Sequence, residues 1–297
     1  MRPILQEALR AECRLLFRTA EESEARHPGA QVPVQIDPAY PVSLQGITFP
    51  DEIETVMLLA RYRAALEATR DGTSRLLRLR EELSERPDPD RWMSADASDL
   101  QAVFYWAQAL LTALDQQDPL GTVFSVDEDI LGVYEYDASG PSYDDRVVNR
   151  ATIRLYWAVI GLVSEWLGCK VEDLTIVVLA HELSHAYTQL GADIEGRRWS
   201  AVKFARLEAA VAEGLAQYYT DRVLRRLASR YPEALSAHEK MLPHQPDIYR
   251  THQNWLEDFT PEAIRRAMLE MRRWNERTLG DLERRLIEAR NNLEPGH

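Results

Sequence analysis

One stretch of the chain constrains the fold more than any other, because it combines a strongly apolar helix with buried polar side chains. Residues 175–190 read TIVVLAHELSHAYTQL, contain no proline and follow the acidic pair Glu172 and Asp173. Acidic residues favour the start of a helix, and Gly191 stands where a helix commonly ends. The apolar run 176–180 predicts that this helix is buried. Its two histidines and its glutamate therefore need partners that compensate for lost hydration.

His181 and His185 are four residues apart, so on a helix they share one face and both imidazoles can reach one metal ion. Glu182 is rotated by about 100° from His181, so it is placed to reach a metal-bound water and not the metal itself. This H-E-x-x-H pattern is typical of a zinc site in which the glutamate is the general base. The alternative, two exposed histidines on an amphipathic helix, is disfavoured by the apolar neighbours.

A catalytic zinc ion usually has three protein ligands, so a third must come from elsewhere in the chain. The extended motif H-E-x-x-H-x-x-G-x-x-H is absent, since Thr188 stands where its glycine would be and no histidine stands at its last position. Cys169 is not favoured as the third ligand, because it precedes the motif and is expected in the turn before the helix. The best source of the third ligand is the segment 200–230, which is predicted to be one long helix that begins at Ser200.

That helix contains the run Glu213-Gly214-Leu215-Ala216. An H-E-x-x-H helix followed, one helix later, by E-G-x-A resembles the gluzincin family of metallopeptidases. The resemblance covers roughly residues 150–230. It implies a zincin-like core, Zn²⁺ as the cofactor, Glu213 as the third zinc ligand, and a peptide or protein as the substrate.

The residue types around Glu213 agree with this resemblance, because Gly214 and several nearby alanines allow two helices to approach closely. The predicted helix lengths introduce an offset of about 12 Å between His185 and Glu213, at 1.5 Å per residue. A simple hairpin would place Glu208 closer, so Glu208 stays an alternative ligand, and Asp193 a weaker one. The loop 191–198 could absorb the offset.

Peptide hydrolysis also needs a donor for the developing oxyanion. The candidates are His252, Tyr249 and Tyr218, although each could equally be a packed aromatic or an ordinary histidine. Gln217 and Asp221 are candidate outer partners of a ligating histidine. The alternating segment 152–156 is a candidate edge strand for an extended peptide, as the family resemblance implies, or simply a core strand.

The predicted fold is α+β and predominantly α-helical, with a small mixed sheet beside the metal-binding helix. A helical N-terminal region, 1–120, precedes a metallopeptidase core, 121–297. The expected elements are helices over 5–26, 51–85 (broken near Gly72), 99–117 (capped by Ser98), from 157 to about 168, and after Thr260, with extended segments at 32–48, 122–126, 130–136 and 152–156.

Composition limits which partners, cellular location and source organism are expected. A net charge of −13 argues against a nucleic-acid partner. Only two cysteines, far apart, favour a reducing, cytoplasmic location, and no apolar run or leader predicts a membrane span or export. With only three lysines, the strong preference for arginine is typical of a GC-rich, bacterial genome.

We therefore expect a zinc-dependent peptidase that hydrolyses peptide bonds through a metal-bound water activated by Glu182. The alternatives are a zinc-binding regulatory or interaction protein with a structural metal site, and a non-peptidase zinc amidase. Glu182 argues against a structural site, which needs no base. Residues 1–117 carry no chemical signature, so they could form a prodomain, a substrate-recognition module or a surface for a regulatory partner.

Overall fold

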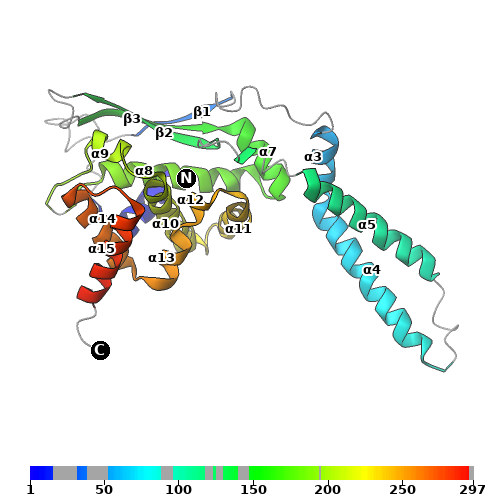
Figure 1. Cartoon of the computed structure of the whole chain (residues 1–297). Coiled ribbons are helices and arrows are strands. Elements are labelled where there is room, and N and C mark those ends of the chain that lie inside the picture. Colours follow the sequence, from blue (N-terminus) through cyan, green and yellow to red (C-terminus); the bar gives the residue numbers. More distant parts are fainter. Residues whose placement is uncertain are drawn as a thin grey trace.

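The computed structural model describes residues 1–15, 32–38, 53–87, 96–117, 123–124, 130–139, 147–193 and 195–293. Most of the described chain is helical, and it includes one three-stranded mixed sheet. The sheet lies along one side of the long helix α8, and the C-terminal helices pack on the other side (Figure 1). The predicted α+β class with a small mixed sheet beside the motif helix is confirmed at this level.

Helix α8, Val171–Leu190, carries the H-E-x-x-H motif through the centre of the molecule. Glu172 and Asp173 lie in its first turn, as predicted, and all of residues 176–190 are buried. Gly191 ends the helix without a left-handed backbone, since its φ is −64°. A Cβ at Gly191 would lie 2.5 Å from the Tyr187 carbonyl oxygen and 2.7 Å from Leu15 Cβ. Glycine is therefore needed there for close packing and not for a special backbone conformation.

The sheet has the order β1-β3-β2, with β1 (Val34–Asp37) parallel and β2 (Gly132–Ser139) antiparallel to β3 (Val147–Tyr156). The segment 152–156 therefore belongs to the central strand, so of its two predicted alternatives the core strand is confirmed and the edge strand was wrong. β2 is an outer strand, and no described strand pairs with its other edge. Both β2 and β3 contact α8, which places the sheet beside the motif.

The N-terminal region contributes to the same core. Helix α1, Arg2–Cys13, buries Leu5 and Leu9 and packs against α8 and α10. It ends at Cys13, well before the predicted residue 26, and residues 16–31 lie outside the described part of the chain. Because β1 also pairs with β3, residues on both sides of the predicted boundary near residue 120 belong to one sheet.

The following helices are α3 (Ile53–Arg61), α4 (Arg63–Ser84) and α5 (Ala97–Gln117). The helix break that was predicted near Gly72 lies at Tyr62 instead, and Gly72 is inside α4. Ser98 is not the cap of α5: it lies within the helix and donates its backbone N–H to Asp96 Oδ1 at 3.0 Å. The helices α4 and α5 form a hairpin that extends away from the core (Figure 1).

Two further predictions need correction. Val123 and Phe124 are helical, although the run 122–126 suggested a strand; its other residues are not described. The segment 200–230 is not one helix. It forms α9 (Ala201–Ala205), which is capped by the Ser200 side chain as predicted, and then α10 (Ala209–Leu227). Helix α7, Trp157–Leu167, ends at Gly168 with a left-handed φ of 59°, as expected for a helix-ending glycine.

The C-terminal part is helical: α11 (Pro232–Met241), η3 (Leu242–His244), α12 (Asp247–Arg250), α13 (His252–Asp258), α14 (Pro261–Trp274) and α15 (Leu279–Leu293). Among the described residues, no helix has both the length and the apolar character that crossing a bilayer requires.

Candidate metal centre

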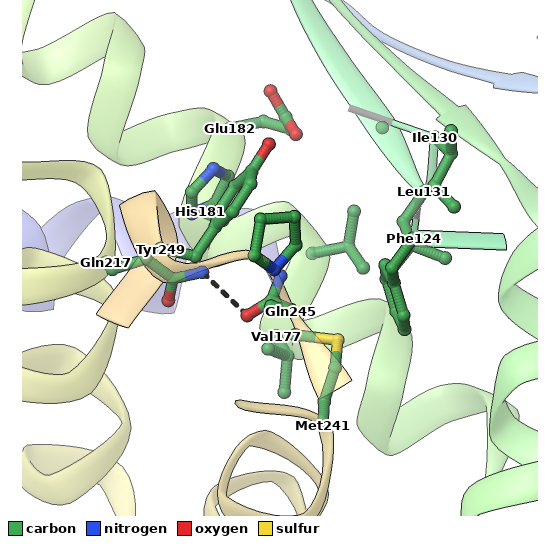
Figure 2. A pocket seen from close by; sticks show the side chains of 13 residues that line it. Phe124, Ile130, Leu131, Val177, His181, Glu182, Gln217, Met241, Gln245 and Tyr249 are labelled. Carbon is green, nitrogen blue, oxygen red and sulfur yellow. Dashed lines mark hydrogen bonds between the residues drawn. The ribbon is translucent and has the colours of Figure 1, made fainter. Parts of the chain in front are cut away.

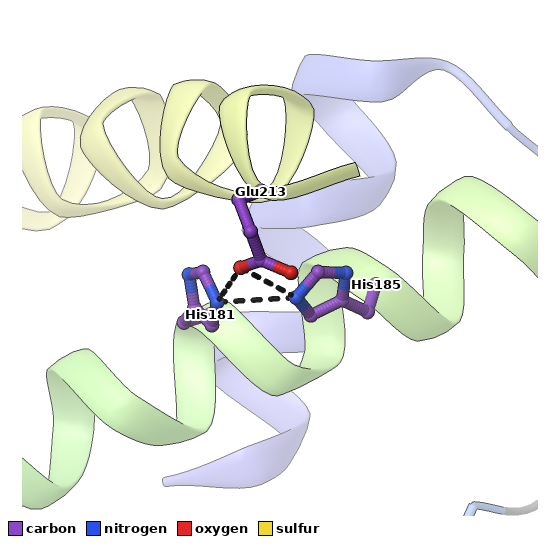
Figure 3. A group of neighbouring side chains, drawn as sticks. All are labelled: His181, His185 and Glu213. Atoms are coloured by element: carbon purple, nitrogen blue, oxygen red, sulfur yellow. Dashed lines mark hydrogen bonds and ion pairs between the residues drawn. The ribbon is translucent and has the colours of Figure 1, made fainter. Parts of the chain in front are cut away.

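Three side chains predicted as metal ligands meet at one point (Figure 3). His181 and His185 project from adjacent turns of α8, and Glu213 projects toward them from α10. Their ligand atoms lie close together: His181 Nε2 is 3.1 Å from His185 Nε2 and 3.1 Å from Glu213 Oε2, and His185 Nε2 is 3.3 Å from Glu213 Oε2. Within the described residues this is the one histidine, cysteine or carboxylate group of three or more with such spacing.

The interruption between α9 and α10 explains how Glu213 reaches the histidines. Because α10 starts again at Ala209, Glu213 is the fifth residue of its helix. The offset expected from a continuous helix therefore does not arise. Arg272 of α14 fixes the loop between α8 and α9. Its guanidinium donates to the carbonyl oxygens of Thr188, Gly191 and Arg197 at 2.6, 2.9 and 3.0 Å.

The spacing of the three atoms fits zinc. Ligands at about 2.05 Å from a tetrahedral zinc ion are about 3.3 Å from one another. The observed separations of 3.1–3.3 Å match this triangle. Two imidazole nitrogens and one carboxylate oxygen are also the ligand types that zinc prefers in catalytic sites, where the remaining position is left open. The residues present thus fit a three-ligand zinc site.

The electrostatics around Glu213 favour its charged form. Burial alone would raise the pKa of this carboxyl group, but the charge and hydrogen bonds of His185 and His181 outweigh it and hold the pKa well below its usual range. The side chain is 15% exposed. A buried carboxylate beside two imidazoles is a suitable ligand for a divalent cation.

Glu182 follows His181 in the sequence but is not one of the three candidate ligands. It is 1% exposed, and it lines a pocket together with His181. The start of β2 gives it room: a Cβ at Gly132 would lie 3.0 Å from Glu182 Oε1 and 2.8 Å from Val178 Cγ1. Gly132 was not identified from the sequence, because nothing in its local pattern marks it as a neighbour of the motif.

The pocket in front of Glu182 has mainly apolar walls. They come from α8, from the chain around residues 130–132, and from the segment that ends α11 and leads into α12 (Figure 2). Tyr249 of α12 also lines it, with its ring centroid 6.0 Å from that of His181. Figure 2 shows Tyr249, His181 and Glu182 together at one end of the pocket. Of the predicted oxyanion donors, Tyr249 is the one that the structure brings to the motif.

The other two candidate donors lie elsewhere. His252 Nδ1–H donates to the backbone carbonyl of Tyr249 at 2.9 Å, and its ring lines a second cavity, not the pocket at the motif. Burial lowers the pKa of His252. Tyr218 is buried against Tyr219, with ring centroids 5.1 Å apart, and burial raises its pKa above the usual range. Both residues have structural roles in this arrangement.

Gln217, one turn after Glu213, takes part in a directional chain of hydrogen bonds. His238 Nε2–H donates to Gln217 Oε1 at 3.1 Å, and Gln217 Nε2 donates to Gln245 Oε1 at 3.2 Å. Gln217 and Gln245 both line the pocket at the motif. Asp221 instead binds Arg225 at 2.7 Å and lines the second cavity. His238 and Gln245 were missed because no motif or periodicity connects them to the histidines.

The alternative third ligands are not at the centre. Glu208 is the exposed residue before α10, and its Oε2 accepts a hydrogen bond from the Leu279 N–H at 2.7 Å. Asp193 Oδ1 accepts from the backbone N–H groups of Glu195 and Arg197, which fixes the loop. Glu208 was an alternative to Glu213 only because the helix break before Ala209 could not be predicted.

Comparisons of the whole chain with protein-family models, curated proteins and solved structures find no match.

Proposed function

We propose that this protein is a zinc-dependent peptidase with a zincin-like core. In this proposal His181, His185 and Glu213 bind Zn²⁺, and Glu182 is the general base. One observation carries the proposal: the three candidate ligand atoms have the spacing of a tetrahedral zinc site, and a second carboxylate, that of the buried Glu182, lines the pocket that His181 also lines.

Zinc in such a site lowers the pKa of a water molecule and polarises a carbonyl group. The protein supplies the remaining chemistry. Glu182 accepts a proton from the attacking water and can deliver it to the leaving amine. Its burial beside apolar side chains keeps competing water away and strengthens its electrostatic interactions.

Two neighbouring features support peptide as the substrate. The Tyr249 hydroxyl group is a suitable donor for the oxyanion that forms on the attacked carbonyl. The strand β2 begins at Gly132, next to Glu182, and no described strand occupies its outer edge. An extended peptide added to this edge would present its backbone near Glu182. β2 therefore takes the role that the sequence suggested for residues 152–156.

The ligand number argues for a catalytic rather than a structural metal site. Structural zinc sites usually have four protein ligands, whereas three of the described residues converge here. A structural site also gives no reason to bury Glu182 in the pocket wall. A small-substrate amidase would use the same residues, so peptide turnover is the measurement that separates the two enzymes.

The test compares wild type with Glu182→Gln, using metal analysis and a mixed peptide library read by mass spectrometry. Both proteins should bind about one zinc ion per chain. Glu182→Gln should cleave the selected peptides about 10²–10⁴ times more slowly. His181→Ala should lose both zinc and cleavage. Equal cleavage by Glu182→Gln and wild type would rule out the mechanism, and zinc binding by wild type without peptide cleavage would favour the structural or amidase alternatives.

A further inference from the structure

The α4–α5 hairpin has two chemically different sides. Its helices touch along a narrow seam that includes the buried Thr73 and Ala107. On one side of this seam Arg63 binds both Asp115 of α5, at 2.6 Å, and Glu67, at 3.7 Å. Successive residues of a helix are rotated by about 100°. The other charged residues at the centre of α4 therefore lie on this same side or on the surface that faces away from α5. One side is therefore stabilised by charge.

The opposite side is mainly apolar. The same rotation places Ala68, Gly72, Leu76 and Leu79 of α4 beside Val103 and Trp106 of α5, and we call these six residues the hairpin face. Its larger members are exposed: Leu76 by 51%, Leu79 by 49%, Val103 by 43% and Trp106 by 60%. Contiguous apolar surface of this kind marks an interaction site.

The composition of the two helices makes this exposure unusual. The sequence of α5 has only two charged residues, Asp115 on the charged side and Asp99, which the same rotation places on the hairpin face near its tip, and it also contains a Val-Phe-Tyr-Trp run. A Cβ at Gly72 would meet no described atom within 4 Å, although glycine in the middle of a helix is unfavourable. Both features suit a hairpin whose apolar side is covered by another helical pair.

The dimensions of the hairpin face suit a partner of the same kind. A helix of 22 residues is about 33 Å long, and two packed helices about 20 Å wide present on the order of 650 Å². A standard interface buries about 800 Å² on each partner. A second hairpin therefore matches the face in length and width, and two paired hairpins make a four-helix bundle.

The distribution of small and large side chains also matches a second copy. On α4 the small residues Ala68 and Gly72 lie toward the base of the hairpin, and Leu76 and Leu79 lie toward its tip. A two-fold axis across the middle of α4, with the hairpins antiparallel, sets the small residues of one copy against the leucines of the other. This is the self-complementary pairing that a two-fold dimer requires.

We infer that the protein is a homodimer in which the hairpin faces of two chains pack together as an antiparallel four-helix bundle. This assigns a role to the N-terminal helices that is independent of the zinc site, and it names a second copy of the chain as the partner.

Sedimentation equilibrium of the full-length protein tests the inference, with two disruptive variants, each compared with its neighbour in sequence. Leu79→Glu and Trp106→Glu place a charge on the hairpin face, whereas Arg78→Glu and Tyr105→Glu change residues that point away from it. Wild type and both controls should have twice the 34.1 kDa mass of one chain, and both disruptive variants should have 34.1 kDa. Unchanged helical circular dichroism and zinc content show that each variant is folded.

Two outcomes would overturn the inference. The first is a monomeric wild type at about 50 μM, because interfaces of this size give dissociation constants of micromolar or below. The second is a dimer that both disruptive variants leave intact. If the wild type is monomeric, its binding to phosphatidylcholine vesicles through the hairpin face would identify a lipid surface as the occupant.

Discussion

The indole of Trp255 lies directly over Gly214, so that a Cβ added to Gly214 would be only 2.5 Å from Cη2 of Trp255. Gly214 follows Glu213, the proposed third ligand, on α10, and Trp255 is a buried residue of α13. The sequence suggested that this glycine lets the two motif helices approach each other. The structure shows that it makes room for a third helix, which packs on α10 behind the ligand.

Gly214→Ala should therefore disturb the ligand next to it. Because Trp255 is 2% exposed and cannot easily move, we expect a loss of about 1–3 kcal/mol in the free energy of unfolding, as for other overpacked sites. Zinc affinity should fall as Glu213 shifts. Gly161→Ala is the matched control, because a Cβ there meets no described atom within 4 Å and should stabilise α7 by up to about 1 kcal/mol. Thermal unfolding and zinc titration measure both effects.

A pair of glutamine substitutions distinguishes the two candidate ligands on α10. Glu213→Gln removes a ligand charge, so zinc affinity should fall by more than the roughly 10–100-fold that losing an outer partner costs. Glu208→Gln should leave zinc affinity unchanged, because Glu208 binds the Leu279 backbone and not the metal centre. Competition with a chelator of known affinity gives both values. Equal losses in the two variants would contradict the assigned ligand set.

Gly132→Ala should affect turnover more than metal binding. The new methyl group would press on Glu182 Oε1 and Val178 Cγ1, at 3.0 and 2.8 Å, and so displace the proposed base. We expect peptide cleavage to slow by at least 10-fold, within the share that a positioned base contributes, while about one zinc ion per chain is retained. Wild-type cleavage by Gly132→Ala would show that Glu182 tolerates displacement, or that it is not the base.

His238 should make stability fall in mild acid. Burial lowers the pKa of His238 from 6.5 to about 4; Asp221 opposes this shift, and the nearby His252, His181 and Arg225 add to it. The unfolded chain therefore takes up a proton between about pH 6.5 and 4 that the folded chain does not. The stability contributed by neutral His238 is complete above pH 6.5, and about 2 kcal/mol of it is lost by pH 5.

Urea unfolding at pH 7 and pH 5 measures this contribution, with the zinc-free protein used at both values to separate it from metal loss. The difference between the two pH values should shrink by about 2 kcal/mol in His238→Gln, which cannot be protonated in this range. An equal pH dependence in wild type and variant would show that His238 is not buried in its neutral form.

The motif and its helix could be predicted because their signals are local, whereas Glu213, the carboxylate that meets the two histidines, was predicted from the family resemblance. The spacing of His181 and His185 requires only a helix, and an apolar stretch around them requires a buried one. The class of fold followed from the same kind of periodicity. The helix break before Ala209 left no comparable signal, since residues 206–208 contain neither proline nor glycine. That break is held by contacts with α15, which lies far away in the sequence.

The rest of the candidate site depends on long-range packing. Gly132, Gln245 and His238 come to the motif from the sheet and from α11 and its following turn, and no spacing relates them to His181. Strand order was unpredictable for a similar reason. Parallel pairing of β1 with β3 joins segments separated by the whole α3–α5 region, so nothing local shows that β3 is central.

The turn at residues 206–208 sets the rotational phase of α10 independently of α9. A residue inserted within this turn can be taken up by the turn, and Glu213 keeps its direction. A residue inserted between Ala209 and Ala212 would instead advance Glu213 by about 100° and 1.5 Å along the helix, away from both histidines. Insertions are therefore tolerated before Ala209 but not between Ala209 and Glu213. The first turn of α10 thus determines whether the Glu213 carboxylate meets the two histidines.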